Sequence, residues 1–499
     1  MKSELKKTIG HSGIYTLGIV LNRMISIAML PVYTRYLTPA DYGVLELLEI
    51  TVDVVSIVAG LGILNGLSKY YYLLESEMER NKLVSTLFVL VIVFYLAGCV
   101  MGGASSRLLS TLVFKGDQYS HLISLSFLNL FLQIVFHANM SYLQTQKRSL
   151  SFIVFSSLNL GLKLALNVLF VIYLRMGVIG VLYSAAISYI VLDGIMTFRT
   201  FSRVGFHFSI ETSKELIKFG YPFVLSGLCA FLTTYSDRFF LNHYADLRTV
   251  GIYSLGYKFG FLLMMFPVQP IISIWMVQRF EVVKNEDSTK IFNKFLSWFV
   301  IVILTVALAI SLFIRDVLQV MSAPAFWEAY KIVPIILLAY FFQACTDFFD
   351  FGIYHSGKTK HMAYGTFIAA IVVIALNFLL IPKFGIYGAA WATLFGFIAR
   401  LIYYYQASQT LYEIDFQFRK PLVTLSLAAL VCMANIVIAG KFSYLSNKMV
   451  SLSSSVILLL FFLTSLFMLH IIDKDERIII VDSLRSPMKL FKELKNLKN

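Results

Sequence analysis

The sequence predicts an all-α, polytopic membrane protein of about 14 transmembrane helices, arranged as two parallel six-helix repeats around a central cavity, plus two extra C-terminal helices. Three observations lead to this fold class: an apolar composition, a series of apolar runs of spanning length, and a turn that occurs twice. Of the 499 residues, 58% are hydrophobic and 14% are charged. Soluble proteins are typically about one quarter charged, so this composition excludes a soluble globular chain.

Fourteen apolar runs are long enough to cross a bilayer, which takes roughly 20 residues of helix. Polar clusters separate most of them. At two tight turns, LRMG (174–177) and PKFG (382–385), a Gly or Pro ends one helix just before the next begins. The predicted spans are 10–35, 44–68, 83–104, 118–144, 152–174, 177–198, 216–242, 250–278, 295–314, 328–355, 361–381, 385–408, 421–440 and 452–472.

Lys and Arg are distributed unevenly between alternate loops. With the N-terminus placed in the cytoplasm, 28 of them lie on the cytoplasmic side and nine on the outer side. Cytoplasmic loops normally carry the excess of these residues. The distribution therefore predicts an even number of spans with both termini in the cytoplasm. It also accounts for the net charge of +14 without nucleic acid as a partner.

A short polar turn occurs twice, as RYLTPADYGV and as HYADLRTVGI. Its Gly43 and Gly251 lie 208 positions apart, and the same offset relates GVIG (177–180) to GIYG (385–388). Each half would hold six spans, an even number, so both halves would enter the membrane in the same sense. The predicted units are an N-lobe with helices 1–6 (1–208), a C-lobe with helices 7–12 (209–416), and helices 13–14 with a basic cytoplasmic tail (417–499).

Several basic residues lie inside the predicted spans, where a charge is costly and is a candidate for function. A cavity lined by cations would hold an anionic headgroup such as a pyrophosphate, with Arg offering the better bidentate fit. The alternative is that these charges form internal ion pairs that only fix helix packing. The candidate substrate-binding residues are Arg23, Lys163, Arg238 and Lys258.

Acidic residues form two short stripes. Glu46, Glu49 and Asp53 are spaced three and four positions apart, which places them on one helix face. Asp347 and Asp350 are three positions apart on a later span. Neither stripe can face lipid at acceptable cost. We therefore treat Asp53, Glu49, Asp347 and Asp350 as candidate coupling sites for a proton or sodium ion, with structural pairing as the alternative.

No catalytic motif is present in the sequence. It lacks a GxxxxGK[ST] phosphate loop, an HExxH or GxSxG motif and a Cys/His cluster, and its four cysteines lie in apolar runs without metal or redox spacing. We expect no enzymatic activity, no cofactor and no bound metal.

Four segments carry a family resemblance: LPVYTRYLTPADYGVLEL (30–47), YSDRFFLNHYADLRTVGIYSLGYKFG (235–260), HSGKTK (355–360) and LNFLLIPKFGIYGAAWAT (376–393). They resemble the bacterial polysaccharide transport (Wzx-type) O-antigen flippases of the multidrug/oligosaccharidyl-lipid/polysaccharide exporter superfamily. The resemblance covers the whole chain. Its motifs are diagnostic of the family and poor at naming a substrate.

The resemblance implies a translocator that flips an undecaprenyl-pyrophosphate-linked oligosaccharide to the outer leaflet, by alternating access without ATP hydrolysis. The product would serve O-antigen (lipopolysaccharide), capsule or exopolysaccharide assembly. The resemblance also implies a cationic cavity, a place in the bacterial cytoplasmic (inner) membrane among its lipids, and a polysaccharide polymerase and glycosyltransferases as partners. The alternatives are a cation-coupled multidrug or small-molecule antiporter, a lipid II flippase, and a membrane-embedded glycosyltransferase or polymerase, which the short outer loops disfavour.

Overall fold

The computed structural model describes residues 29–441, 448–469 and 471. The regular secondary structure of that part is entirely helical, which confirms the predicted all-α, polytopic class. Twelve of its helices are long and apolar enough to cross a membrane, and a thirteenth span results if the bent pair Pro39–Ala59 and Ile63–Leu73 counts as one. The predicted span 10–35 lies mostly outside the described residues.

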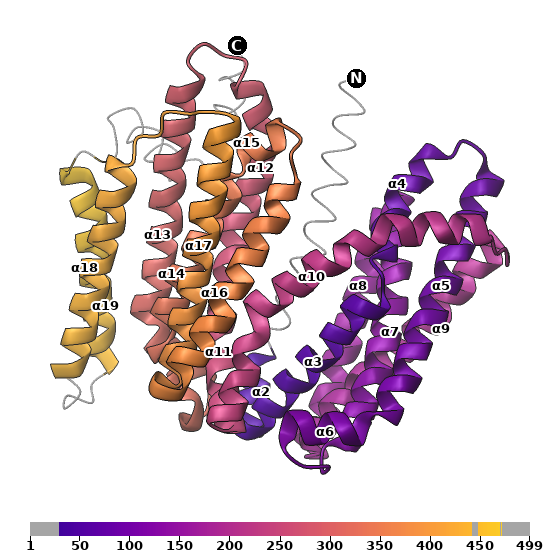
Figure 1. The fold of residues 1–499 in the computed structure, drawn as a ribbon. Coiled ribbons are helices and arrows are strands. Elements are labelled where there is room, and N and C mark those ends of the chain that lie inside the picture. Colours follow the sequence, from indigo (N-terminus) through magenta and orange to yellow (C-terminus); the bar gives the residue numbers. More distant parts are fainter. Residues whose placement is uncertain (1–28, 442–447, 470, 472–499) are drawn as a thin grey trace.

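The helices form two lobes, joined by the long helix α10, and a flanking pair (Figure 1). The N-lobe consists of α2 (Leu30–Tyr36), α3 (Pro39–Ala59), η1 (Ile63–Asn65), α4 (Gly66–Leu73), α5 (Glu77–Ala104), α6 (Ser106–Phe114), α7 (Ser120–Thr145), α8 (Ser149–Asn167), η2 (Val168–Tyr173) and α9 (Gly177–Val204). After α10 (Ile210–Tyr244), the C-lobe consists of α11 (Leu247–Leu263), η3 (Met264–Val268), α12 (Gln269–Val282), α13 (Ser288–Met321), η4 (Pro324–Lys331), α14 (Val333–Phe349), α15 (Phe351–His355), α16 (Lys360–Phe384) and α17 (Ile386–Leu411). The flanking pair is α18 (Arg419–Lys441) and α19 (Lys448–Met468).

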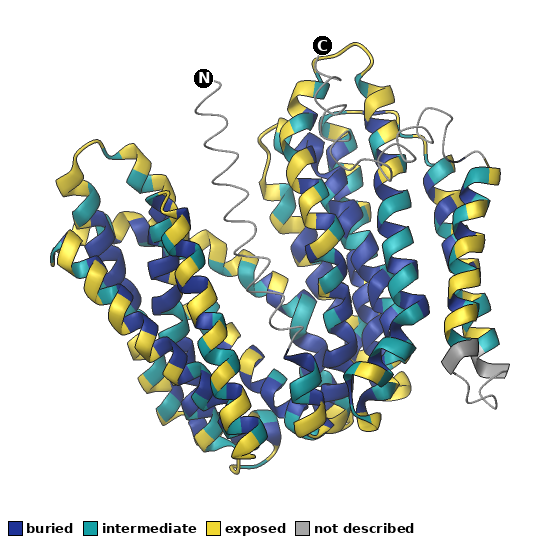
Figure 2. Cartoon of the chain, turned by 180° about the vertical axis from the view of Figure 1, so that it is seen from behind, coloured by how far each residue is buried: buried dark blue, intermediate teal, exposed yellow. Residues whose placement is uncertain are grey.

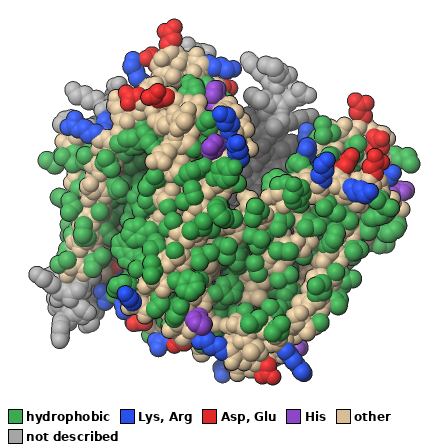
Figure 3. Space-filling view, in the orientation of Figure 1, with side chains coloured by type: hydrophobic (Ala, Val, Ile, Leu, Met, Phe, Trp, Pro, Cys, Tyr) green, Lys and Arg blue, Asp and Glu red, His purple; other side chains and the backbone are tan. Residues whose placement is uncertain are grey.

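The surface of the molecule matches a membrane protein. Figure 3 shows a broad hydrophobic band across one face, with the charged side chains gathered at its two ends. Figure 2 shows that buried residues form a core within each lobe. Many large apolar side chains also remain exposed on the helices, as expected of a protein that lipid surrounds.

In both copies of the duplicated turn, a side chain at the helix start accepts a hydrogen bond from the backbone N–H three residues later, at the beginning of α3 and of α11. The Thr38 hydroxyl accepts from the backbone N–H of Asp41 at 3.1 Å, and the Asp41 carboxylate accepts from the backbone N–H of Thr38 at 3.0 Å. In the second copy, the Asp246 carboxylate accepts from the backbone N–H of Thr249 at 2.7 Å. These caps satisfy amides that the first helical turn leaves unpaired, which explains the polar turn between two apolar spans.

The second pair of repeated glycines starts α9 and α17. Gly177 has φ of +60° and Gly385 has φ of +53°, a region where a side chain is disfavoured. These residues let the chain reverse direction within a few residues. The sequence prediction that each tight turn separates two spans is confirmed by the helix bounds on either side.

The two lobes touch through the first pair of repeated glycines, in α3 and α11. A Cβ atom added at Gly43 would overlap the carbonyl oxygen of Leu247, and one added at Gly251 would overlap the carbonyl oxygen of Pro39. The backbones of the two helices are therefore in direct contact. The repeat partners that sequence comparison places 208 positions apart lie against each other.

Hydrogen bonds between the lobes surround this contact. The Lys115 ammonium donates to the His243 carbonyl at 2.9 Å, and the Asn242 amide donates to the Val113 carbonyl at 2.5 Å. On the other flank, Thr34 and Arg35 donate to the carbonyls of Met321 and Val320 at 3.1 and 2.9 Å. We call this region, with the Gly43–Gly251 contact, the closed end.

The lobes diverge away from the closed end, as Figures 1 and 2 both show. Helix α10 contacts both lobes. The ring centre of its Phe219 lies 5.8 Å from that of Tyr70 in the N-lobe, and the ring centre of its Phe240 lies 4.6 Å from that of Phe378 in the C-lobe. The loops that the Lys and Arg distribution assigns to the cytoplasm lie at the divergent end (Figure 1). By that distribution, the closed end is the outer one.

Replacing Gly43 or Gly251 with Ala is predicted to open the closed end, because the new methyl group overlaps backbone that cannot move aside. Overpacking of this kind costs about 1–3 kcal/mol, a shift of roughly 5- to 150-fold in the equilibrium between closed and open ends. Double electron–electron resonance between labels at positions 107 on α6 and 248 on α11 measures the separation, once the native cysteines are replaced.

The control is Gly161→Ala in α8, where an added Cβ has nothing within 4 Å. It should leave the distance distribution unchanged. An unaltered distribution in both Gly43→Ala and Gly251→Ala would contradict the prediction.

Candidate functional site

An ion pair joins the lobes close to the glycine contact. The Lys258 ammonium of α11 lies 3.0 Å from the Glu46 carboxylate of α3 and 4.8 Å above the ring of Tyr42. The Glu46 side chain is 12% exposed and that of Lys258 is 30% exposed, so water screens the pair only in part. The predicted substrate-binding residue Lys258 is thus held by a carboxylate of the opposite lobe.

The acidic stripe of α3 faces the C-lobe. Glu46, Glu49 and Asp53 all interact electrostatically with the Tyr235 hydroxyl of α10. Glu49 and Asp53 are exposed, although both lie within a helix that is otherwise largely buried. The sequence prediction that the stripe avoids lipid agrees with this placement between the lobes.

Lys163 of α8 lies between carboxylates from two other helices. Its ammonium is 3.8 Å from the centre of the Tyr189 ring, and it interacts electrostatically with Glu49 of α3 and Asp193 of α9. Both carboxylate oxygens of Asp193 are buried and lack a hydrogen-bond partner. Lys163 therefore supplies positive charge that offsets a buried acid.

Polar contacts fix the helix that carries Lys163. The Ser188 hydroxyl of α9 donates to the Asn159 side chain of α8 at 2.9 Å. The Tyr33 hydroxyl of α2 donates to the Asn167 side chain at 3.3 Å. These bonds lie on either side of Lys163 along α8 and limit its rotation about the helix axis.

Arg238 lies inside the C-lobe rather than on the face between the lobes. Its guanidinium is 2.7 Å from the Asp237 carboxylate and 3.9 Å from the centre of the Tyr257 ring, and its side chain is 2% exposed. Asp237 also accepts from the Tyr253 hydroxyl at 2.6 Å. In this conformation the charge of Arg238 is balanced internally, which is the packing alternative that the sequence left open.

Asp350 and Asp347 belong to a second cluster within the C-lobe. Asp350 pairs with Arg279 of α12 at 2.5 Å, and both side chains are buried. Asp347 interacts electrostatically with Arg400 of α17, whose guanidinium donates to Gln343 at 3.3 Å. Asp347 of α14 and Asp350, which follows that helix, are thus each matched by an arginine that the sequence did not single out.

The predicted site residues fall into separate groups. Lys163, Lys258, Glu49 and Asp53 share the face between the lobes, whereas Arg238, Asp347 and Asp350 lie within the C-lobe. Arg23 lies outside the described residues.

Three contributors were not identified from the sequence: Asp193, Arg279 and Arg400. Asp193 carries a visible signal, since it is an acidic residue within the predicted span 177–198. Arg279 carried none, because its partner is 71 positions away.

Reversing one charge of the inter-lobe pair is predicted to weaken the closed end. Glu46→Lys places two ammonium groups opposite each other and should lengthen the distance between labels at positions 107 and 248. The double variant Glu46→Lys/Lys258→Glu restores opposite charges and should restore the distance. The two variants differ by a coupling energy of about 0.5–3 kcal/mol. Equal distances in the single and double variants would show that the pair does not hold the lobes.

The buried pair of the C-lobe is predicted to govern stability instead. Arg279→Met leaves the Asp350 carboxylate buried without a partner and should lower the free energy of unfolding by about 3–5 kcal/mol. Arg279→Met/Asp350→Leu removes both charges and should be considerably more stable than the single variant. Thermal unfolding in detergent measures the stability of the single and the double variant. A double variant as unstable as the single one would contradict this.

Comparison with known proteins places the chain in a family. A model of the polysaccharide biosynthesis protein family matches residues 10–276, more than half of the sequence. No curated protein sequence matches.

Among solved structures, the chain is similar to the lipid II flippase MurJ in an inward closed conformation, with a TM-score of 0.70 at 13% identity, covering 91% of this chain and 98% of that one. It is also similar to a multidrug resistance MATE family transporter of the MOP superfamily. The inward-facing form gives a TM-score of 0.63 at 13% identity, with 77% and 93% covered. The outward-facing form gives 0.54 at 14% identity, with 80% and 94% covered.

At these identities the structural likeness establishes the fold, which is that of MurJ and the MATE transporters. Those proteins are a lipid II flippase and a multidrug resistance transporter. By the match over residues 10–276, the chain, whose apolar helices are those of a multi-pass membrane protein, belongs to the polysaccharide biosynthesis protein family.

Proposed function

We propose that this protein is a flippase that moves undecaprenyl-pyrophosphate-linked oligosaccharide repeat units across the bacterial cytoplasmic membrane. Its products would supply O-antigen, capsule or exopolysaccharide assembly. The observation that carries the proposal is the position of Lys163 and Lys258. They come from different lobes, and both interact with the acidic face of α3: Lys258 with Glu46 beside the closed end, and Lys163 with Glu49 one turn farther along the helix. Membership of the polysaccharide biosynthesis family supports the choice of a glycan substrate.

A pyrophosphate group is suited to the two lysines because it offers several anionic oxygens to separate ammonium donors. To reach Lys258 it must displace Glu46, the carboxylate that now pairs with it at 3.0 Å. The substrate would thereby replace the ion pair that joins the lobes. A ligand shifts a conformational equilibrium only through unequal affinity for the two states, and this exchange provides that inequality.

The exposed carboxylates of Glu49 and Asp53 would repel the same pyrophosphate. Neutralising them with a proton or a sodium ion removes the repulsion. We therefore propose that occupation of this stripe by a cation accompanies substrate entry, which would couple translocation to an ion gradient. Asp347 and Asp350 contribute less to this scheme, because Asp350 is already paired with Arg279.

The proposed orientation places both termini and the divergent end in the cytoplasm, where a lipid-linked repeat unit would enter. The closed end would then seal the outer side until substrate binds. A polysaccharide polymerase acting on the outer surface, and the glycosyltransferases that build the repeat unit, would be the functional partners.

A second candidate is a cation-coupled antiporter for small organic cations. The exposed Glu49 and Asp53 favour it, since carboxylates between the lobes attract cations. Lys163 and Lys258 oppose it, because they would repel the same substrate. A lipid II flippase is a third candidate. Like the first candidate, it would need a cationic face to bind the pyrophosphate of its substrate.

Deletion of the gene is predicted to abolish one surface polysaccharide and to leave lipid-linked repeat units on the cytoplasmic side of the membrane. Surface glycan is measured by gel and immunoblot, and the lipid fraction by mass spectrometry. Loss of drug resistance with normal glycan would overturn the proposal in favour of the antiporter. Loss of viability with lipid II accumulation would point to the lipid II flippase.

Complementation tests the two lysines directly. Lys163→Met and Lys258→Met are predicted to lower export at least tenfold at equal protein abundance, whereas Lys163→Arg keeps the charge and should retain part of it. Lys284→Met is the control, because Lys284 is exposed at the divergent end outside the inter-lobe face. Full export by both methionine variants would rule out their role in binding the pyrophosphate.

A further inference from the structure

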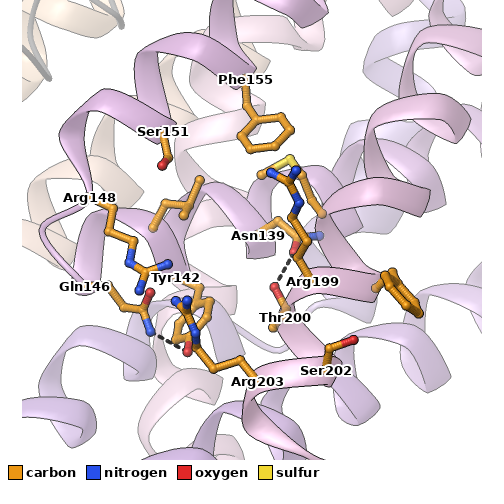
Figure 4. Close-up of a pocket in the computed structure, with 13 residues that line it drawn as sticks. Asn139, Tyr142, Gln146, Arg148, Ser151, Phe155, Arg199, Thr200, Ser202 and Arg203 are labelled. Atoms are coloured by element: carbon orange, nitrogen blue, oxygen red, sulfur yellow. Dashed lines mark hydrogen bonds between the residues drawn. The ribbon is translucent and has the colours of Figure 1, made fainter.

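A second basic site lies outside the inter-lobe face, at the end of the N-lobe that the Lys and Arg distribution assigns to the cytoplasm. It is a pocket of about 600 Å³ between the ends of α7, α8 and α9 (Figure 4). Three arginines line it: Arg148 precedes α8, and Arg199 and Arg203 lie in the last turns of α9. None of the residues assigned to the inter-lobe face takes part in it.

The three guanidinium groups are not balanced by acidic residues. All three side chains are exposed, and none has a carboxylate within 4.0 Å in the part of the chain that the structure describes. Figure 4 shows Arg148 and Arg203 converging on Gln146. Arg199 lies 5.9 Å from the centre of the Phe155 ring. The pocket therefore concentrates positive charge that a multivalent anion would neutralise.

The floor of the pocket is polar and held in place. Asn139 of α7 accepts a hydrogen bond from the Thr200 hydroxyl at 3.0 Å and donates one to the Thr197 hydroxyl at 2.9 Å. Ser151 in the first turn of α8 also lines the pocket. The N-terminus of α8, the positive end of its helix dipole, borders the pocket, because Arg148 and Ser151 line it, and the Arg148 side chain does not cap this end.

Apolar side chains continue from the pocket along both helices that flank it. On α8 they are spaced four positions apart, so they lie on one face of the helix. All of them are exposed and leave an apolar surface for acyl chains. They are Leu150, Val154 and Leu158 on α8, and Val191, Ile195 and Phe198 on α9. On α9, Val191 and Ile195 lie eight and four positions before Arg199, on the same face of the helix as that arginine.

We propose that this pocket binds the phosphate headgroup of an anionic lipid in the cytoplasmic leaflet. Guanidinium groups bind phosphate through paired, charge-assisted hydrogen bonds, and basic pockets between transmembrane helices suit such headgroups. The lipid's acyl chains would lie along the exposed faces of α8 and α9. Since α8 also carries Lys163, a bound lipid would brace the helix that presents a proposed substrate-binding residue.

Native mass spectrometry of the full-length protein, titrated with defined lipids, tests the proposal. Cardiolipin, with two phosphates, and phosphatidylglycerol should bind at least tenfold more tightly than phosphatidylcholine. The triple variant Arg148→Gln/Arg199→Gln/Arg203→Gln should lose at least tenfold in affinity for cardiolipin. The control Lys284→Gln/Lys358→Gln/Lys360→Gln removes three exposed charges from the same end of the molecule and should bind as the natural protein does.

Two further measurements distinguish binding of a lipid from binding of a free phosphate, and loss of binding from loss of folding. Inorganic pyrophosphate at millimolar concentration should displace little cardiolipin, because it lacks the acyl chains; complete displacement would overturn the assignment to a lipid. A thermal unfolding midpoint equal to that of the natural protein shows that the triple variant is folded. If the triple variant does not fold, the single variant Arg199→Gln is tested in its place. Equal cardiolipin binding by the arginine variants and the lysine control would also overturn the proposal.

Discussion

The contact between the backbones of α3 and α11 at Gly43 and Gly251 determines how the two lobes meet. Because neither residue has a Cβ atom, the two helices approach until a side chain of any size would overlap a carbonyl group. This approach brings Glu46, one helical turn along α3, within 3.0 Å of Lys258, two turns along α11. The ion pair and the surrounding hydrogen bonds at the closed end depend on it.

The ion pairs of this protein differ in whether they must break when the two lobes move apart. Arg238–Asp237 and Arg279–Asp350 lie inside one lobe, so a rotation of the lobes leaves both pairs intact. Lys258–Glu46 crosses the lobes and must break when they separate. Breaking a partly hydrated ion pair costs far less than separating a fully buried one, which leaves a charge buried without a partner. Rigid-body motion of two stable lobes is therefore cheaper than any rearrangement within them.

Much of the fold was predictable because it follows from apolar periodicity, which is local. The spans, their termination at Gly177 and Gly385, and the pairing of the two halves all appear in the sequence. The distribution of charges was less predictable. Arg238 and Lys258 are both basic residues within spans, yet one faces Asp237 inside the C-lobe and the other faces the N-lobe. Their orientation depends on how α10 and α11 pack against other helices, which no local pattern encodes. The arginine pocket combines Arg148 with residues some 50 positions later and needed the packing of α8 against α9.

The caps of α3 and α11 have a consequence for how such proteins diverge. Thr38 and Asp41 in one half correspond in position to Asp246 and Thr249 in the other, with the two residue types exchanged. A comparison by identity scores two mismatches, although in both halves the first residue caps the backbone amide of the fourth. Selection on hydrogen-bond chemistry rather than on residue type lets sequences drift apart while helix boundaries stay in register.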